Sequence, residues 1–155
     1  MSTDPEYVAA QTGIVVDALI ADERLEHLIG PARRRTTTDA MGATVTFEGV
    51  VRDHDEGHPV AELIYSAHPT AHSVIRQVAE NISQKHPEVR LWTAHRIGRL
   101  AVGDVAFVVI VAAAHRGPAF AAASELTDTI KATVPIWKNQ KLTSGDTHWV
   151  GVDMP

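Results

Sequence analysis

The chain has 155 residues, of which 45% are hydrophobic, and its 14 basic and 19 acidic side chains give a formal net charge of −5 at pH 7. This length and apolar content suit one domain, and its core must be aliphatic because aromatic residues make up only 5%. The acidic balance disfavours a general nucleic-acid binder, which neutralises phosphates with Lys and Arg. No apolar run approaches the roughly 18 residues of a membrane span. We therefore expect neither nucleic acid nor a membrane as a partner.

The sequence contains no cysteine. The chain therefore has no disulfide, no thiolate metal ligand and no cysteine nucleophile or sulfur carrier of its own. Its nine histidines show no HExxH pattern or other convincing metal spacing, so we expect no metal site and no cofactor. Residues 1–7 lack the basic and apolar parts of a signal peptide, and we expect a cytoplasmic location.

In the first part of the chain, the loose alternation of apolar residues in Thr12–Ile20 predicts a strand. Asp22–Ile29 is predicted to form a short helix that stops at the breaker Gly30-Pro31. Three arginines and three threonines follow in Arg33–Thr38, which we expect to be an exposed, mobile loop. Residues 1–41 should pack on the same single domain as residues 42–155, which form its main α+β part.

The rest of the chain mixes strands, hairpins and two main helices. The predicted strands are listed by number: 43–51, 60–65, 89–97, 105–113, 136–142 and 148–152. Gly49 suggests a bulge or a close approach in the first of them, and the continuous apolar run Val105–Ala113 indicates a strand buried on both faces. Helical spacing of apolar residues predicts helices over Ala71–Ile82 and Pro118–Lys131. This order is typical of an α+β fold with mixed or antiparallel sheets.

Three clusters place cations at the ends of predicted elements. Arg52 follows a core strand, and His115 and Arg116 precede a helix, where the positive end of the dipole disfavours a cation unless an anion is bound. Lys131 closes that helix and Lys138 follows in a strand. Each cluster also has a purely structural interpretation: an exposed strand-end arginine, a solvated loop, and a lysine that the helix dipole favours.

These clusters cannot all lie in one pocket of one chain. A helix over Pro118–Lys131 spans about 20 Å at ~1.5 Å per residue. His115 and Arg116 at its start and Lys131 at its end then require either two sites or one pocket completed across a subunit boundary. We favour a two-fold dimer, which can bring the helix start of one chain near the helix end of the other.

Five segments together resemble the large, catalytic subunit of molybdopterin synthase. They are Gly42-Ala-Thr-Val-Thr-Phe-Glu-Gly-Val-Val-Arg52, His95-Arg-Ile-Gly98 with Gly103-Asp104, Ala114-His-Arg116, Lys131-x-x-x-Pro-x-Trp-Lys138 and Gly145-Asp-x-x-Trp-Val150. The resemblance runs from Gly42 to Val150. It implies an α/β-hammerhead-like fold and a sulfurtransferase that converts cyclic pyranopterin monophosphate into the dithiolene molybdopterin.

The resemblance also implies partners and residue roles. Sulfur would arrive as the C-terminal thiocarboxylate of a small, ubiquitin-like subunit, and two copies of this chain would form a homodimer within a heterotetramer. Lys131 and Lys138 would be the catalytic residues. The substrate-binding residues it implies are Arg52, His115, Arg116, Val50, Val51, Asn139 and Gln140.

Three departures from the family pattern affect the expected site. Val50 stands where relatives often carry Lys, Tyr65–Pro69 replaces a more acidic and aromatic run, and Asp153 stands where some relatives are basic. An arginine from Arg33–Arg35 could replace that basic residue. A different class of function also stays open, namely a non-catalytic module that binds a ubiquitin-like tail or a phosphorylated metabolite. A nucleotide-binding protein that uses the helix start at Gly117-Pro118 is a weaker alternative.

Overall fold

The computed structural model describes residues 4–55 and 57–151. Its helices are α1 (Pro5–Ala10), α2 (Ile29–Thr36), α3 (Ala71–Lys85) and α4 (Arg116–Thr133), with the 3-10 turn η1 at Leu25–His27. Its strands are β1 (Ile14–Ala21), β2 (Ala43–Val50), β3 (His54–Asp55), β4 (His58–Ala67), β5 (Val89–Arg96), β6 (Gly98–Ala101), β7 (Val105–Ala113), β8 (Ile136–Leu142) and β9 (Thr147–Gly151). Two long helices with mixed and antiparallel sheets confirm the predicted α+β class.

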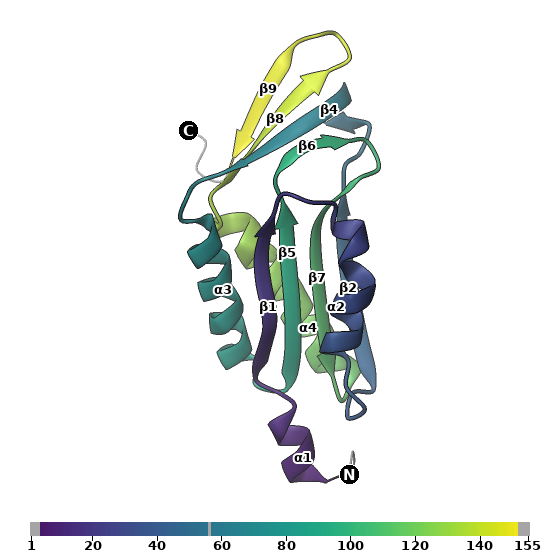
Figure 1. Ribbon diagram of the computed structural model, residues 1–155, viewed down its shortest axis with the longest axis vertical. Helices are drawn as coiled ribbons and strands as arrows, with labels where there is room; N and C mark the ends of the chain where they lie inside the picture. The colour runs from purple at the N-terminus through teal and green to yellow at the C-terminus, as the bar shows by residue number, and fades with distance from the viewer. Residues whose placement is uncertain (1–3, 56, 152–155) are drawn as a thin grey trace.

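The first sheet has the strand order β1-β5-β7-β2, with β1 parallel to β5 and the other pairs antiparallel. Helices α3 and α4 cover one face, whereas η1 and α2 cover the other (Figure 1). All nine residues of β7 are buried, because successive side chains enter the two apolar layers in turn. The prediction of a strand buried on both faces is confirmed.

The second sheet lies beyond the end of the first and has the strand order β3-β4-β8-β9, with β6 also paired to β4 (Figure 1). The chain enters it three times: from β2 into β3, from β5 into β6, and from α4 through Pro135 into β8. The C-terminal ends of β2 and α4 therefore both point at the junction between the sheets. This junction is where the candidate site forms.

Two glycines allow close approach of the backbone. The register between β2 and β7 shifts between Gly49 and Val50, and a Cβ on Gly49 would come within 3.3 Å of Cβ of Phe107. The prediction of a bulge or a close approach is confirmed on both counts. At the end of β9, a Cβ on Gly151 would collide with the indole ring of Trp137, so only glycine fits there.

The N-terminal part differs most from the sequence prediction. The expected helix over Asp22–Ile29 is wrong: η1 ends at His27, and α2 then runs through Gly30-Pro31. Pro31 is tolerated because the first turn of a helix needs no N–H donor at that position. The expected loop Arg33–Thr38 is wrong as well, because α2 continues to Thr36, whose side chain is buried and donates to the carbonyl of Ala32 at 2.7 Å.

Several other boundaries also shift. Helix α1 was not expected, the polar stretch 53–59 contains the β3–β4 hairpin, and β6 is a separate strand after β5. Helix α4 begins at Arg116 rather than Pro118, and α3 extends to Lys85. Asp153 lies outside the described residues. No helix in the described ranges has both the length and the apolar character needed to cross a membrane.

Candidate functional site

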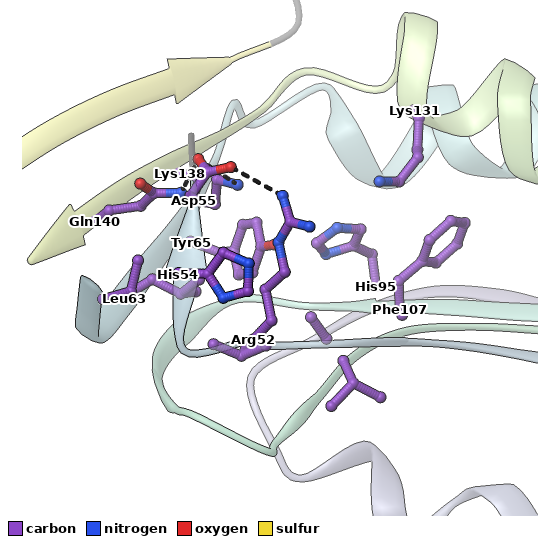
Figure 2. Close-up of a pocket in the computed structure, with 15 residues that line it drawn as sticks. Arg52, His54, Asp55, Leu63, Tyr65, His95, Phe107, Lys131, Lys138 and Gln140 are labelled. Carbon is purple, nitrogen blue, oxygen red and sulfur yellow. Dashed lines mark hydrogen bonds and ion pairs between the residues drawn. The ribbon is translucent and has the colours of Figure 1, made fainter. Parts of the chain in front are cut away.

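A cavity of about 250 Å³ opens at the junction between the two sheets (Figure 2). It is lined by β2 and the segment after it, by the β3–β4 hairpin, by β5 and β7, and by α4 and β8. The lining residues are Gly49, Val50, Val51, Arg52, His54, Asp55, Val60, Leu63, Tyr65, His95, Ala106, Phe107, Lys131, Lys138 and Gln140.

Three of the predicted cations meet in this cavity. Arg52 follows the end of β2, Lys131 lies in the last turn of α4, and Lys138 belongs to β8 (Figure 2). The backbone before Arg52 is fixed, because the N–H of Val51 donates to the carbonyl of Asp104 at 2.9 Å and the Val51 carbonyl accepts from Gly103 at 2.7 Å. Segments far apart in the sequence therefore deliver three positive side chains to one hollow.

The neighbours of Lys138 divide between the two faces of β8. Gln140 lies two residues further along the strand and lines the cavity with Lys138. Asn139 points to the opposite face, and its side-chain oxygen is buried with no hydrogen-bond partner in the described part of the chain. Val50 and Val51, also expected at the site, do line the cavity. A contribution of Asn139 through its backbone stays a prediction.

A carboxylate lies among the cations. Asp55 accepts hydrogen bonds from Nη2 of Arg52 at 3.2 Å and from Nε2 of Gln140 at 2.6 Å, and its Oδ2 is 3.9 Å from Nζ of Lys138. The Gln140 hydrogen bond, followed by the charges of Lys138 and Arg52, lowers the pKa of Asp55 below its ordinary value. The carboxylate therefore stays ionised at neutral pH.

The inner wall is aromatic and holds a neutral histidine. The His95 ring meets the Tyr65 ring edge-on at 4.9 Å and stacks on Phe107 at 5.3 Å. Burial lowers the pKa of His95 to about 4, and the nearby charge of Lys131 acts in the same direction. Its Nδ1 donates to the carbonyl of Arg96 at 2.8 Å, which leaves Nε2 as the unprotonated nitrogen. Burial also raises the pKa of Tyr65 to about 12.

A second hollow adjoins the first. It shares Tyr65, His95, Lys131 and Lys138, and the residues that it adds are Ile130, Val134, Ile136, Val150 and Gly151. Both hollows therefore border the two lysines, and the second has a more aliphatic wall. This arrangement suits a group that presents a negative charge to the lysines.

His115 and Arg116 do not line either hollow. They lie exposed at the start of α4, where His115 makes no side-chain capping hydrogen bond. From Arg116 to Lys131 the helix spans about 22 Å at ~1.5 Å per residue. The expectation that these groups cannot share one pocket within a single chain is confirmed.

Sequence reasoning missed three residues of the site. Asp55 lies between two predicted strands, and only the β3–β4 hairpin turns its side chain back to the cations. His95 carries a signal in the sequence, because it belongs to one of the five motifs and directly follows apolar residues near the end of a predicted strand. Tyr65 closes the inner wall. Across residues 4–55 and 57–151, no three His, Asp or Glu side chains lie close enough to hold a metal ion.

The site can hold anions beside an uncharged aromatic wall. Positive side chains at such a place stabilise a phosphate or carboxylate, and also negative charge that develops on a reacting oxygen. The neutral imidazole of His95 adds a hydrogen-bond acceptor without adding a charge. Such a cavity fits group transfer between anionic reactants.

Comparisons with known proteins give a consistent result. A family model described as MoaE protein matches residues 21–133, which include Arg52, His115, Arg116 and Lys131 and end before Lys138. A molybdopterin synthase catalytic subunit from Nostoc sp. is 41% identical over 115 residues, covering 73% of this chain and 70% of that protein. Molybdopterin synthase catalytic subunit 1 of Mycobacterium tuberculosis is 40% identical over 136 residues, covering 86% and 85%.

Solved structures agree with these matches. The crystal structure of molybdopterin synthase from Staphylococcus aureus superposes with a TM-score of 0.79 at 31% identity and covers 86% of this chain and 96% of that chain. A complex of subunits 1 and 2 of the molybdopterin-converting factor from Helicobacter pylori has a TM-score of 0.66 at 18% identity, covering 90% of each chain. The second match speaks for the fold alone.

Proposed function

The chain belongs to the MoaE protein family and is an enzyme of molybdenum cofactor biosynthesis, and from this premise we propose the reaction that its cavity catalyses. The chain transfers sulfur to cyclic pyranopterin monophosphate and so forms the dithiolene of molybdopterin. The observation that carries this proposal is the gathering of Arg52, Lys131 and Lys138 in one cavity, because both the substrate phosphate and a sulfur-bearing thiocarboxylate are anions.

The sulfur comes from a small, ubiquitin-like partner subunit. Its C-terminal Gly-Gly tail enters along the aliphatic hollow that contains Val134, Ile136 and Gly151, so that its thiocarboxylate reaches Lys131 and Lys138. The missing cysteine fits this route, since the sulfur travels on the partner. The solved complex of subunits 1 and 2 of the converting factor is the precedent for such a pair in this fold.

The two lysines act on the acyl carbon of the tail. When sulfur bonds to the pterin, the acyl–sulfur bond must break. Oxygen from water then replaces sulfur on the acyl carbon, and the tail ends as an ordinary carboxylate. The ammonium groups of Lys131 and Lys138 stabilise the oxyanion that forms on the acyl carbon. Arg52 holds the phosphate with its fork of donors. Val50, Val51 and Gln140 line the substrate position, and Asn139 contributes through its backbone.

A second copy of the chain supplies His115 and Arg116. Strand β2 lies at an edge of the first sheet, and α4 packs on β2 and β7. Ala43, at the start of β2, pairs with Ala113 near the helix start, whereas Val50, at its end, lies in the cavity wall. Antiparallel pairing of two β2 edges therefore puts the helix start of one copy beside the cavity of the other.

Exposed apolar side chains support this seam. Phe120 on α4, a helix that packs on β2, is 60% exposed, and Val50 at the end of β2 is 52% exposed. An unpaired edge strand is also prone to pair with another chain. The assembly is then a homodimer of this chain with one small subunit at each end. The expected cytoplasmic location stays a prediction.

Mass spectrometry of a reconstituted reaction tests the proposal. The purified chain is mixed with the pyranopterin and a thiocarboxylated small subunit, and the matched control uses the same subunit with an ordinary carboxylate. We expect the dithiolene product, and a small subunit whose sulfur is replaced by oxygen, only with the thiocarboxylate. Binding of the small subunit with no pterin conversion would contradict the proposal and favour the non-catalytic module.

A further inference from the structure

The Asp55 carboxylate occupies the middle of the positive cluster. It connects three side chains, since Gln140 donates to it at 2.6 Å, Arg52 donates to it at 3.2 Å and the ammonium of Lys138 lies 3.9 Å away (Figure 2). Two of these partners are cations that the proposed reaction uses. A carboxylate in this place also repels the anionic reactants, so its presence calls for a compensating role.

The three side chains Gln140, Asp55 and Arg52 form a chain of contacts in which exposure to solvent increases from the first to the last. Gln140 in β8 is only 2% exposed, the Asp55 side chain is 18% exposed, and the Arg52 side chain is 67% exposed. A long, exposed guanidinium samples many rotamers, and an isolated surface ion pair does little to restrain it. Here the carboxylate is itself held by a buried strand residue, so it is a fixed acceptor for Arg52.

The hairpin geometry explains how Asp55 reaches this position. β3 and β4 pair through His54–Pro59 and Asp55–His58, and Gly57 has a φ of +80°. This tight turn folds the segment after Arg52 back over the cavity, with Asp55 facing inward. Its neighbour Asp53 does not line the cavity, and its carboxylate instead lies 2.8 Å from Nδ1 of His54, with 79% of the side chain exposed.

We propose that Asp55 is a positioning residue that holds the Arg52 guanidinium beside Lys138, at the place where the substrate phosphate binds. This inference rests on the proposed function for the identity of the anion. Asp55 contacts protein side chains rather than the reacting atoms, and it acts through Arg52. The lowered pKa of Asp55 is in keeping with this role, because an ionised carboxylate is the better acceptor for a guanidinium.

The test compares Asp55→Asn with Asp53→Asn, which removes a neighbouring carboxylate of the same hairpin outside the cavity. We expect Asp55→Asn to raise KM for the pyranopterin about tenfold and to change kcat much less, since substrate positioning is lost and the lysines remain. Asp53→Asn should keep the wild-type KM. Equal KM values for the two variants would overturn the proposal.

A double-mutant cycle separates positioning from a general structural effect. In an Arg52→Ala background, Asp55→Asn should raise KM no further, because Asp55 then has no guanidinium to hold. Independent, multiplying effects on KM would overturn the proposal. If Asp55→Asn does not fold, Asp55→Glu takes its place in the cycle, since it keeps the charge but moves the carboxylate by one methylene; the same non-additivity is expected.

A readout without turnover distinguishes failure of this inference from failure of the proposed function. In ¹⁵N-labelled protein, the side-chain signals of Arg52 Nε–H and Gln140 Nε2 should shift in Asp55→Asn and stay in place in Asp53→Asn. If the wild-type chain makes no dithiolene and the signals still shift in Asp55→Asn, the reaction is refuted and the positioning role stays intact. Signals that do not move in Asp55→Asn refute the positioning role.

Discussion

The two ends of α4 carry basic side chains in opposite surroundings. At the C-terminal end, Lys131 faces a cavity together with Arg52, Lys138 and a carboxylate. At the N-terminal end, His115 and Arg116 are exposed beside the positive end of the helix dipole, which disfavours them. The C-terminal end contributes to a nearly complete binding site, whereas the N-terminal end presents cations without the other walls of a site. Clusters of cations that look alike in a sequence can therefore have different roles, according to what other elements bring beside them.

Removal of either lysine should produce the largest effect. We expect Lys131→Ala and Lys138→Ala each to lower kcat at least about 10²-fold, because an oxyanion loses a charged partner in a cavity partly closed to water. Dimer mass and thermal unfolding should stay close to the wild type. Rates of dithiolene formation check this, and full turnover by both variants would dismiss the assigned roles.

Removal of Arg116 tests the other end of the helix. We expect Arg116→Ala to raise KM for the pyranopterin about tenfold, since the phosphate loses one charge-assisted contact supplied by the second copy. Arg76→Ala is the matched control, because Arg76 in α3 is also an exposed helical arginine and does not line either hollow. An unchanged KM in Arg116→Ala would mean that the exposed end plays no part in substrate binding.

The buried histidine makes the cavity end sensitive to pH. Folding lowers the pKa of His95 from 6.5 to about 4, so the unfolded chain binds more protons between these values. The contribution of His95 to stability is fully present above pH 6.5 and is lost as the pH falls toward 4. From pH 7.5 to 5 we expect the free energy of unfolding to fall by about 2 kcal/mol through this residue. Urea unfolding at both pH values measures this fall in the wild type and in His95→Gln. An equal fall in the variant would contradict its assignment to His95.

The smallest effect should come from Asn139. Its side chain points away from the cavity, so Asn139→Ala should keep kcat/KM within about twofold of the wild type. Its neighbour on the other face, Gln140, holds Asp55, and Gln140→Leu should therefore affect KM more. Steady-state kinetics of the two variants shows which face of β8 lines the cavity. A larger loss of kcat/KM in Asn139→Ala than in Gln140→Leu would contradict the assignment of Gln140 to that face.

The parts of the fold that the sequence predicts well are those in which apolar periodicity dominates. β7 and α3 are examples, because an uninterrupted apolar run and a regular helical stripe have few alternative structures. Gly30-Pro31 misled the prediction because a breaker pair inside a chain is also an acceptable start of a helix. The short hairpin at His54–Asp55 left no periodic signal at all.

The candidate site divides in the same way. Arg52 and Lys131 lie at the ends of predicted elements, where side chains reach a cleft, and the family resemblance implied roles for both of them and for Lys138. Asp55, Tyr65 and His95 could not be predicted, since their roles depend on tertiary contacts between a hairpin, β4 and β5. The separation of His115 and Arg116 from the lysines followed from helix length alone.

Mixing two impaired variants tests the central claim most directly, namely that one active site joins the lysines of one copy to the helix start of another. Arg116→Ala and Lys131→Ala chains are unfolded, refolded together and assayed at low substrate concentration. Random pairing gives one half of the dimers one chain of each variant, and each of these dimers has one intact site out of two. We therefore predict about a quarter of wild-type activity. The control pair, Lys131→Ala with Lys138→Ala, should recover nothing, because both lysines of a site come from one chain. Failure of the first pair to regain activity, or recovery by the control pair, would contradict the account.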